Sequence, residues 1–138
     1  AVASTAAKFA TPGVHIGLFC STPMVALSRN VSRKAAMEML MLGDAVDAER
    51  ALELGLINKV VEPNELDAAL RVMTDTLLGK SSITLAMGKA AFYEQLEKGV
   101  ADAYAHTGEV MARNMMTADA TEGIDAFIQK RTPVWTGA

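Results

Sequence analysis

GDAVDAERALELGLINKVV, residues 43–61, is the most informative stretch of the chain. Asp47 is of a residue type that caps helices, and the AERALEL segment after it has helical character up to Gly55, so the pattern predicts a short helix. Residues 56–61 are rich in strand-forming side chains and stop before Pro63, which predicts one strand. The stretch therefore reads as a short helix that leads directly into a strand.

The sequence after Pro63 predicts helices and no further strand. Apolar residues recur there at intervals of three and four, which is the helical period. Asn64 is the predicted cap of the first helix, and Ser81 or Ser82 the start of the second. The expected helices cover residues 64–78, 81–96, 100–116 and 119–131.

The sequence before Gly43 predicts both strands and helices. Residues 1–18 are small, β-branched and interrupted by glycine, which predicts a first strand at AVAS and then short strands or extended turns. Ser21, with Pro23 just after it, predicts a capped helix that runs through Leu27. Ser32 predicts the cap of another helix, which ends at Gly43.

Composition narrows the class of protein. A chain of 138 residues that is 51% hydrophobic has the length of one domain with a real core. A net charge of -3, with no basic stripe, argues against nucleic-acid binding. The longest uncharged stretch is broken by proline and glycine, so membrane insertion is not expected. Cys20 is the only cysteine, which excludes an internal disulfide and favours a reducing compartment.

The chain also looks like part of a longer polypeptide, since it opens inside a predicted strand without an initiating Met or a targeting segment. About three strand-like pieces cannot close a sizeable sheet. The chain is therefore either α-rich on its own or completes a sheet begun elsewhere. Its composition changes near Pro63, where strands give way to helices.

Three segments carry a resemblance to a known family: GDAVDAERALELGLINKVVEPNEL, then LAMGKAAF, then DATEGIDAFIQKRTPVW. In this order they resemble the enoyl-CoA hydratase/isomerase family, the crotonases. The first follows the family pattern through Gly43, Ala48, Ala51, Gly55, Leu56, Val60 and Val61. The last follows the closing pattern through Asp119, Glu122, Gly123, Ala126, Phe127, Lys130, Arg131, Pro133 and Trp135. Two long patterns at the right separation are far more specific than one short motif.

The resemblance implies an α/β, crotonase-like (ClpP/crotonase ββα superhelix) fold, present here as a helix-rich C-terminal portion. Residues 1–62 would be the end of the crotonase core, and residues 63–138 a helical region for oligomerisation and for covering the acyl site. The other half of a crotonase supplies both backbone N–H groups that bind the thioester oxygen. A homo-oligomer, trimer or hexamer, is also implied. Met111, Met115 and Met116 would then pack against neighbouring subunits, or alternatively form a core within the chain.

The catalytic residue that the resemblance implies is absent. In the hydratases, the stretch that corresponds to FATPGVHIG, residues 9–17, carries a glutamate directly after the proline. In this chain that position is Gly13. Water addition needs one group to deprotonate the water and another to protonate the α-carbon, which glycine cannot do. His15 is a substitute if the segment is extended, because residues two apart then point to one side. The alternative is a structural or surface histidine.

Other candidate residues follow from the same resemblance. Ser21 stands where dienoyl-CoA isomerases carry an aspartate, and we assign Phe19 and Ser21 to substrate binding. Lys130 would approach the phosphates of coenzyme A, and its alternative role is to complement a helix dipole. Met111 stands where some hydratases place an aromatic residue against adenine.

The remaining candidates have simpler interpretations. Cys20 is read as a small buried residue in preference to a nucleophile. His106 is expected to be exposed or to serve packing. No metal site is expected, since neither histidine has ligand spacing to another ligand.

The predicted function is acyl-CoA binding, and the family activity is addition of water to 2-enoyl-CoA thioesters in fatty-acid metabolism, which Gly13 places in doubt. The expected ligand is a coenzyme A thioester as substrate, with no permanently bound cofactor. The alternatives are a non-catalytic acyl-CoA-binding or assembly protein, another crotonase reaction such as isomerisation or thioester hydrolysis, and a remnant that packs only as a helical oligomer. The expected location is cytoplasmic, or mitochondrial in a eukaryote.

Overall fold

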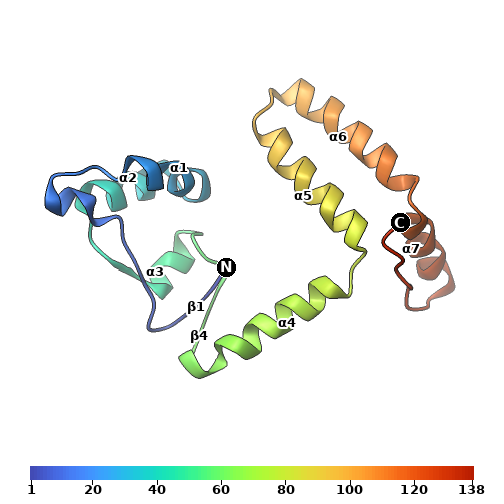
Figure 1. The fold of residues 1–138 in the computed structure, drawn as a ribbon, viewed down its shortest axis with the longest axis horizontal. Helices are drawn as coiled ribbons and strands as arrows, with labels where there is room; N and C mark the ends of the chain where they lie inside the picture. The colour runs from blue at the N-terminus through green and yellow to red at the C-terminus, as the bar shows by residue number, and fades with distance from the viewer. The chain divides into compact units, whose positions relative to one another are not determined.

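The structure is a computed structural model that describes all 138 residues. It divides into two compact units, which we call the N-terminal unit, Ala1–Met73, and the C-terminal unit, Thr74–Ala138. The boundary falls within helix α4 (Leu66–Leu78), so that helix contributes residues to both units. Figure 1 shows the order of the elements along the chain.

The N-terminal unit combines short strands with helices. The strands are β1 (Val2–Ser4), β2 (Lys8–Phe9), β3 (Val46–Asp47) and β4 (Lys59–Val61). The helices before α4 are the 3-10 helix η1 (Pro12–Ile16), α1 (Ser21–Asn30), α2 (Arg33–Leu42), α3 (Ala48–Glu53) and the 3-10 helix η2 (Pro63–Glu65). β1 pairs in parallel with β4, and β2 pairs antiparallel with β3. Both sheets have two strands only, in agreement with the expectation that the chain cannot close a sizeable sheet.

The stretch 43–61 folds as the predicted helix followed by a strand, but the strand covers only residues 59–61 of the expected 56–61, and residues 46–47 form the strand β3, which was not predicted. The Asp47 carboxylate accepts the backbone N–H of Arg50 at 2.8 Å and so caps α3. Gly55 follows the helix with a positive φ of 80°, which favours glycine. Strand β4 then pairs with β1 in the register Ala3 to Val60. Ala48 and Ala51 of α3 are fully buried beside this pair, so small side chains are required there.

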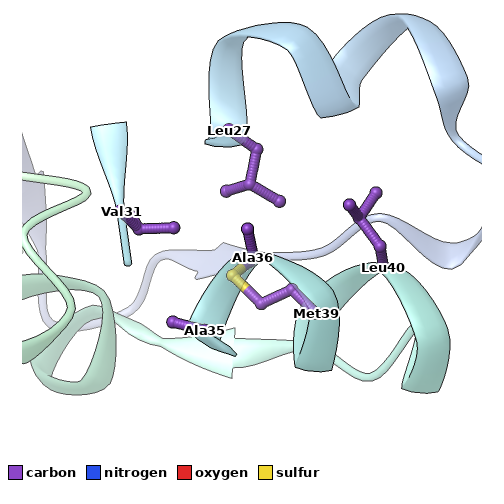
Figure 2. Packing of buried hydrophobic residues seen from close by; sticks show 6 residues of the cluster. All are labelled: Leu27, Val31, Ala35, Ala36, Met39 and Leu40. Atoms are coloured by element: carbon purple, nitrogen blue, oxygen red, sulfur yellow. The ribbon is translucent and has the colours of Figure 1, made fainter. Parts of the chain in front are cut away.

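The larger core of this unit lies between α1 and α2, as Figure 2 shows. The members of this cluster are Leu27, Val31, Ala35, Ala36, Met39 and Leu40. Ser32 caps α2 by accepting the N–H of Ala35, and Gly43 ends it with a φ of 72°. Both ends of α2 therefore agree with the sequence prediction.

Three local predictions were wrong. Residues 12–16 form the 3-10 helix η1, not an extended segment, because Pro12 supplies a first-turn residue and Gly17 ends the helix with a positive φ. Ser21 is the first residue of α1 and does not cap it: its hydroxyl donates to the carbonyl of Phe19. Asn64 lies inside η2 and caps nothing.

The C-terminal unit is helical. It contains the end of α4 and the helices α5 (Ser82–Leu96), α6 (Val100–Met115) and α7 (Ala118–Gln129). Ser81 caps α5 and Thr117 caps α7, each by accepting a backbone N–H three residues on. Asn114 of α6 donates to the hydroxyl of Thr84 of α5 at 3.2 Å, which ties these two helices together. Gly99 is the residue before α6, whereas α5 has already ended at Leu96.

Candidate functional site

The loop that contains Gly13 leaves no room for a side chain. The amide N–H of Gly13 donates to the sulfur of Cys20 at 3.3 Å, and the Gly13 carbonyl accepts the N–H of Leu18 at 2.9 Å. A Cβ added at Gly13 would lie 2.8 Å from that sulfur and 2.8 Å from the Leu18 carbonyl oxygen. Contacts this short do not occur for real Cβ atoms. The local packing thus requires a glycine at position 13.

His15 is held by the end of α2. Its Nε2 donates to the carbonyl of Leu42 at 2.9 Å and lies 4.0 Å from a carboxylate oxygen of Asp44. Gly43 allows this approach, since a Cβ there would lie 2.9 Å from Nε2. Because residues 12–16 are helical, the expectation that His15 projects where a side chain at 13 would go was wrong. The Leu42 contact corresponds to the structural alternative.

The other predicted residues of this loop differ in how far they are buried. Phe19 and Ser21 are exposed, and Ser21 donates only to the carbonyl of Phe19. Cys20 is half-buried and packs against the α1–α2 core. Thr11, which the sequence analysis did not single out, is buried and donates to the carbonyl of Met39 at 2.8 Å. This bond anchors the start of η1 on α2.

Lys130 and Met111 belong to the C-terminal unit, whereas the other predicted site residues belong to the N-terminal unit. Lys130 ends α7 and is exposed. Met111 is 63% exposed, and Met115 and Met116 are exposed too, so the alternative of a core within this chain was wrong for all three. His106 is mostly buried and lies 3.5 Å from Glu94.

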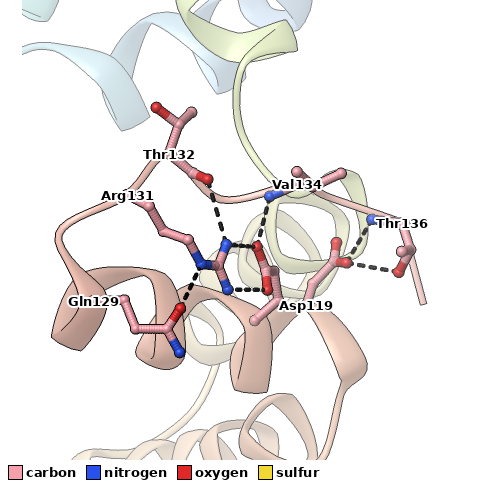
Figure 3. A network of polar contacts seen from close by, with 7 residues as sticks. Asp119, Gln129, Arg131, Thr132, Val134 and Thr136 are labelled. Atoms are coloured by element: carbon pink, nitrogen blue, oxygen red, sulfur yellow. Dashed lines mark hydrogen bonds and ion pairs between the residues drawn. The ribbon is translucent and has the colours of Figure 1, made fainter.

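Residues 119–135, which we call the closing motif, make contacts that hold the C-terminal tail against α7. Asp119 is buried, and its carboxylate accepts the backbone N–H of Thr136 at 2.7 Å and the Thr136 hydroxyl at 2.8 Å (Figure 3). It also accepts the N–H of Gly137 at 3.0 Å. A hydrogen bond from Ser81, followed by those from Thr136, lowers the pKa of Asp119 to about 2. The sequence analysis matched Asp119 to the family pattern but gave it no role.

Glu122 holds the tail one helical turn further on. Both oxygens of the Glu122 carboxylate accept N–H groups of the Arg131 guanidinium, one at 2.8 Å, and one of them also accepts the N–H of Val134 at 2.8 Å. The bonds from Arg131 and then Val134 lower the pKa of Glu122 to about 2, and the same pairing raises the pKa of Arg131. The three-residue spacing of two acids on one helix face was the signal available in the sequence.

Trp135 completes this arrangement. Its indole N–H donates to the carbonyl of Gly79 at 2.9 Å. A Cβ added at Gly123 would lie 3.2 Å from the ring, so this glycine lets the indole approach α7 closely. A mostly apolar hollow of about 500 Å³ lies beside these residues, lined in part by Ser81, Phe127 and Trp135. Neither Lys130 nor Met111 lines it.

Two further properties bear on function. No group of three or more His, Cys, Asp or Glu side chains lies close enough together to hold a metal ion. No helix has both the length and the apolar character needed to cross a lipid bilayer.

Comparison with known proteins decides the family. The enoyl-CoA hydratase/isomerase family profile matches residues 1–138. The chain belongs to the enoyl-CoA hydratase/isomerase family. The chain is 48% identical over 136 residues to the mouse protein named enoyl-CoA hydratase domain-containing protein 3, mitochondrial, and the match covers 99% of this chain and 45% of that protein. It is 31% identical to a crotonyl-CoA hydratase of Syntrophomonas wolfei over 94% of this chain and 50% of that protein.

Solved structures of the enoyl-CoA hydratase/isomerase family confirm the predicted crotonase-like fold. An enoyl-CoA hydratase of Mycobacterium smegmatis superposes with a TM-score of 0.95 at 51% identity, covering 97% of this chain and 52% of that chain. The human enoyl-CoA hydratase domain-containing protein 3 superposes with a TM-score of 0.92 at 47% identity, covering 97% and 53%. The chain spans about half the length of the curated relatives it matches. The roles predicted for residues 1–62 and 63–138 stay predictions.

Proposed function

We propose that the protein binds acyl-CoA thioesters and does not hydrate 2-enoyl-CoA through an acid at position 13. The observation that carries this proposal is the packing of Gly13 against Cys20 and the Leu18 carbonyl, which leaves no space for a glutamate. His15 is not presented in place of a side chain at position 13, because residues 12–16 are helical and its Nε2 donates to the Leu42 carbonyl. Family membership and the intact closing motif support retention of the ligand class.

The test uses the protein at its full natural length and crotonyl-CoA. Calorimetry measures binding, and loss of the enoyl-thioester absorbance measures hydration. We expect binding without appreciable turnover. We also expect Gly13→Glu to gain no activity, because its side chain displaces the loop. The matched control is Gly88→Glu, since nothing lies within 4 Å of a Cβ at this exposed helical position.

The two parts of the proposal fail separately. Absence of crotonyl-CoA binding by the folded protein would show that it is not an acyl-CoA binder. Turnover by the unmodified protein at an enzyme-like rate, on the order of 1 s⁻¹ or faster, would show that hydration does not need an acid at position 13.

A second candidate function is hydration of a 2-enoyl-CoA by groups that this chain does not supply. It is favoured by the relatives named as hydratases, among them the crotonyl-CoA hydratase of Syntrophomonas wolfei. A third is another reaction of the family, namely double-bond isomerisation or thioester hydrolysis. Product analysis after incubation with crotonyl-CoA separates them: hydration yields a 3-hydroxyacyl-CoA, and hydrolysis yields free coenzyme A.

We also propose that the protein assembles as a homo-oligomer, a trimer or hexamer, with a coenzyme A thioester as substrate and no permanently bound cofactor. Support for assembly comes from the large apolar side chains that the C-terminal unit leaves exposed, including Phe92, Tyr104, Met116 and Phe127. Exposed apolar surface of this extent marks interaction sites. Light scattering of the full-length protein measures its mass. The mitochondrial relatives support a mitochondrial location if the source is a eukaryote.

A further inference from the structure

His106 carries a buried nitrogen that has no hydrogen-bond partner. This atom, Nε2, belongs to a side chain of α6, and α6 packs beside α5 in the C-terminal unit (Figure 1). Only 17% of the His106 side chain is exposed. Buried polar atoms of proteins are nearly always hydrogen-bonded, so this exception calls for a physical explanation.

The Glu94 carboxylate of α5 faces this nitrogen. One of its oxygens, Oε2, lies 3.5 Å from His106 Nε2, and the other, Oε1, lies 3.4 Å from the Nζ of Lys98. Each oxygen of Glu94 therefore has its own basic neighbour. Of these two residue types, lysine is charged throughout the neutral range, whereas histidine gains its charge between about pH 8 and pH 5.

The protonation state of His106 decides whether its contact with Glu94 is attractive. In a neutral imidazole, Nε2 is either a donor or an acceptor, and as an acceptor it would face the carboxylate oxygen without a proton between them. In a protonated imidazole both nitrogens are donors, and the positive ring attracts the carboxylate. Proton uptake therefore converts an unpaired buried nitrogen into a donor that faces Glu94.

The other charged groups around His106 are few. His106 and Glu94 line a hollow of about 280 Å³ between the two helices, together with Arg113 of α6 and apolar side chains. The positive charge of Arg113 opposes protonation of His106, whereas the carboxylate of Glu94 favours it. Asp102 and Glu109 lie four residues before and three residues after His106 on α6 itself, and both are exposed. No charged residue of α7 lines the hollow.

We infer that His106 and Glu94 form a pH-sensitive link between α5 and α6, which tightens when His106 takes up a proton. Its contribution is present at pH 5.5 and is lost as the pH rises towards 7.5, because the attraction requires the positive ring. The packing of α5 on α6 is thus firmer in mild acid. This link is independent of the proposed acyl-CoA binding.

Native-state hydrogen exchange on the full-length protein measures the link where it acts. Protection factors, which correct for the pH dependence of intrinsic exchange, report how often α5 and α6 open. The amides of α1 and α2, in the N-terminal unit, are the internal control. A double-mutant cycle of Glu94→Gln and His106→Gln is measured at pH 5.5 and at pH 7.5. The Lys98 contact is common to both histidine backgrounds, so its loss cancels in the cycle.

At pH 5.5, Glu94→Gln should lower the protection of α5 and α6 about fivefold more when His106 is present than in the His106→Gln background. This size is that of an ion pair whose acidic partner is partly exposed. At pH 7.5 the two losses should agree within about twofold. His15→Gln removes the only other histidine and should leave the pH response of α5 and α6 unchanged.

Three results would overturn the inference. They are a coupling of equal size at both pH values, no coupling at pH 5.5, and a pH response of α5 and α6 that disappears in His15→Gln. If His106→Gln folds poorly, Glu94→Gln compared with the unmodified protein still decides. Its loss of protection should shrink from pH 5.5 to pH 7.5, and a constant loss would refute the link.

Discussion

The amide N–H of Gly13 donates to the sulfur of Cys20 at 3.3 Å, so these two residues close the loop between them. A side chain at 13 would meet both the sulfur and the carbonyl oxygen of Leu18. The packing therefore excludes a larger side chain at position 13, including the glutamate expected from the family resemblance. We expect that Gly13→Glu alone does not create a hydratase site.

Gly13→Ala should destabilise the protein by about 1–3 kcal/mol, the usual cost of forcing an extra methyl group into a packed region. Cys20→Ala in the same chain should recover only part of this loss, since the Leu18 carbonyl stays in place. Urea unfolding measures both. Gly88→Ala is the control and should be neutral or stabilising by up to about 1 kcal/mol, because alanine is the better helix former. An unchanged stability of Gly13→Ala would contradict the packing argument.

Acid should weaken the attachment of the C-terminal tail. Asp119 and Glu122 have pKa values lowered to about 2 from ordinary values of 3.8 and 4.5, so the folded state favours their charged forms. The stabilisation is fully present above about pH 5 and is lost as the pH falls towards 2. Thermal unfolding from pH 2 to pH 6 measures it.

Asp119→Asn tests this pH dependence. It should be less stable than the unmodified protein at pH 6, and the difference should shrink towards pH 2. A difference that stays constant over this range would refute the titration argument. Asp102→Asn serves as the control, because Asp102 is exposed and at the start of another helix.

Lys130→Gly should raise stability by about 1 kcal/mol, because glycine adopts the left-handed conformation without a Cβ penalty. Lys130→Ala keeps the penalty and should bring no such gain. Chemical unfolding compares the two variants at one pH. Equal stabilities of Lys130→Gly and Lys130→Ala would show that the left-handed conformation of Lys130 costs nothing.

Gly123→Ala should loosen the tail. The added Cβ would lie 3.2 Å from the ring of Trp135, which must shift and weaken its bond to the Gly79 carbonyl. Trp135 is the only tryptophan, so its emission reports this site directly. We expect a red shift and faster cleavage of the tail by carboxypeptidase. Unaltered emission in Gly123→Ala, with Gly108→Ala as the control, would argue against the close ring contact.

Much of the fold could be predicted locally. Asp47, Ser32 and Ser81 cap helices as expected, because a cap needs only a short polar side chain and the N–H groups that follow it in the chain. The strand at 59–61 and the glycine after α3 were predicted for the same reason. Ser21 and Asn64 show the limit of such patterns: each is a suitable cap residue, but Ser21 is already the first residue of α1 and Asn64 lies inside η2.

The sequence could indicate which positions belong to the candidate site, but it could not indicate which atoms these residues contact. The absent acid at Gly13 and the closing motif at 119–135 are properties of the sequence, since they follow from residue types at given separations. That Gly13 cannot accept a side chain depends on Cys20 seven residues on, and that His15 is engaged depends on Leu42. Lys130 has a left-handed backbone at the end of α7, where its N–H donates to the Phe127 carbonyl. The sequence thus specified the family and most of the helices, and it led to the expectation that a glutamate is missing at position 13, because these follow from residue types close together in the chain. Folding specified which groups are blocked, paired or free, because that depends on atoms brought together from distant parts of the chain.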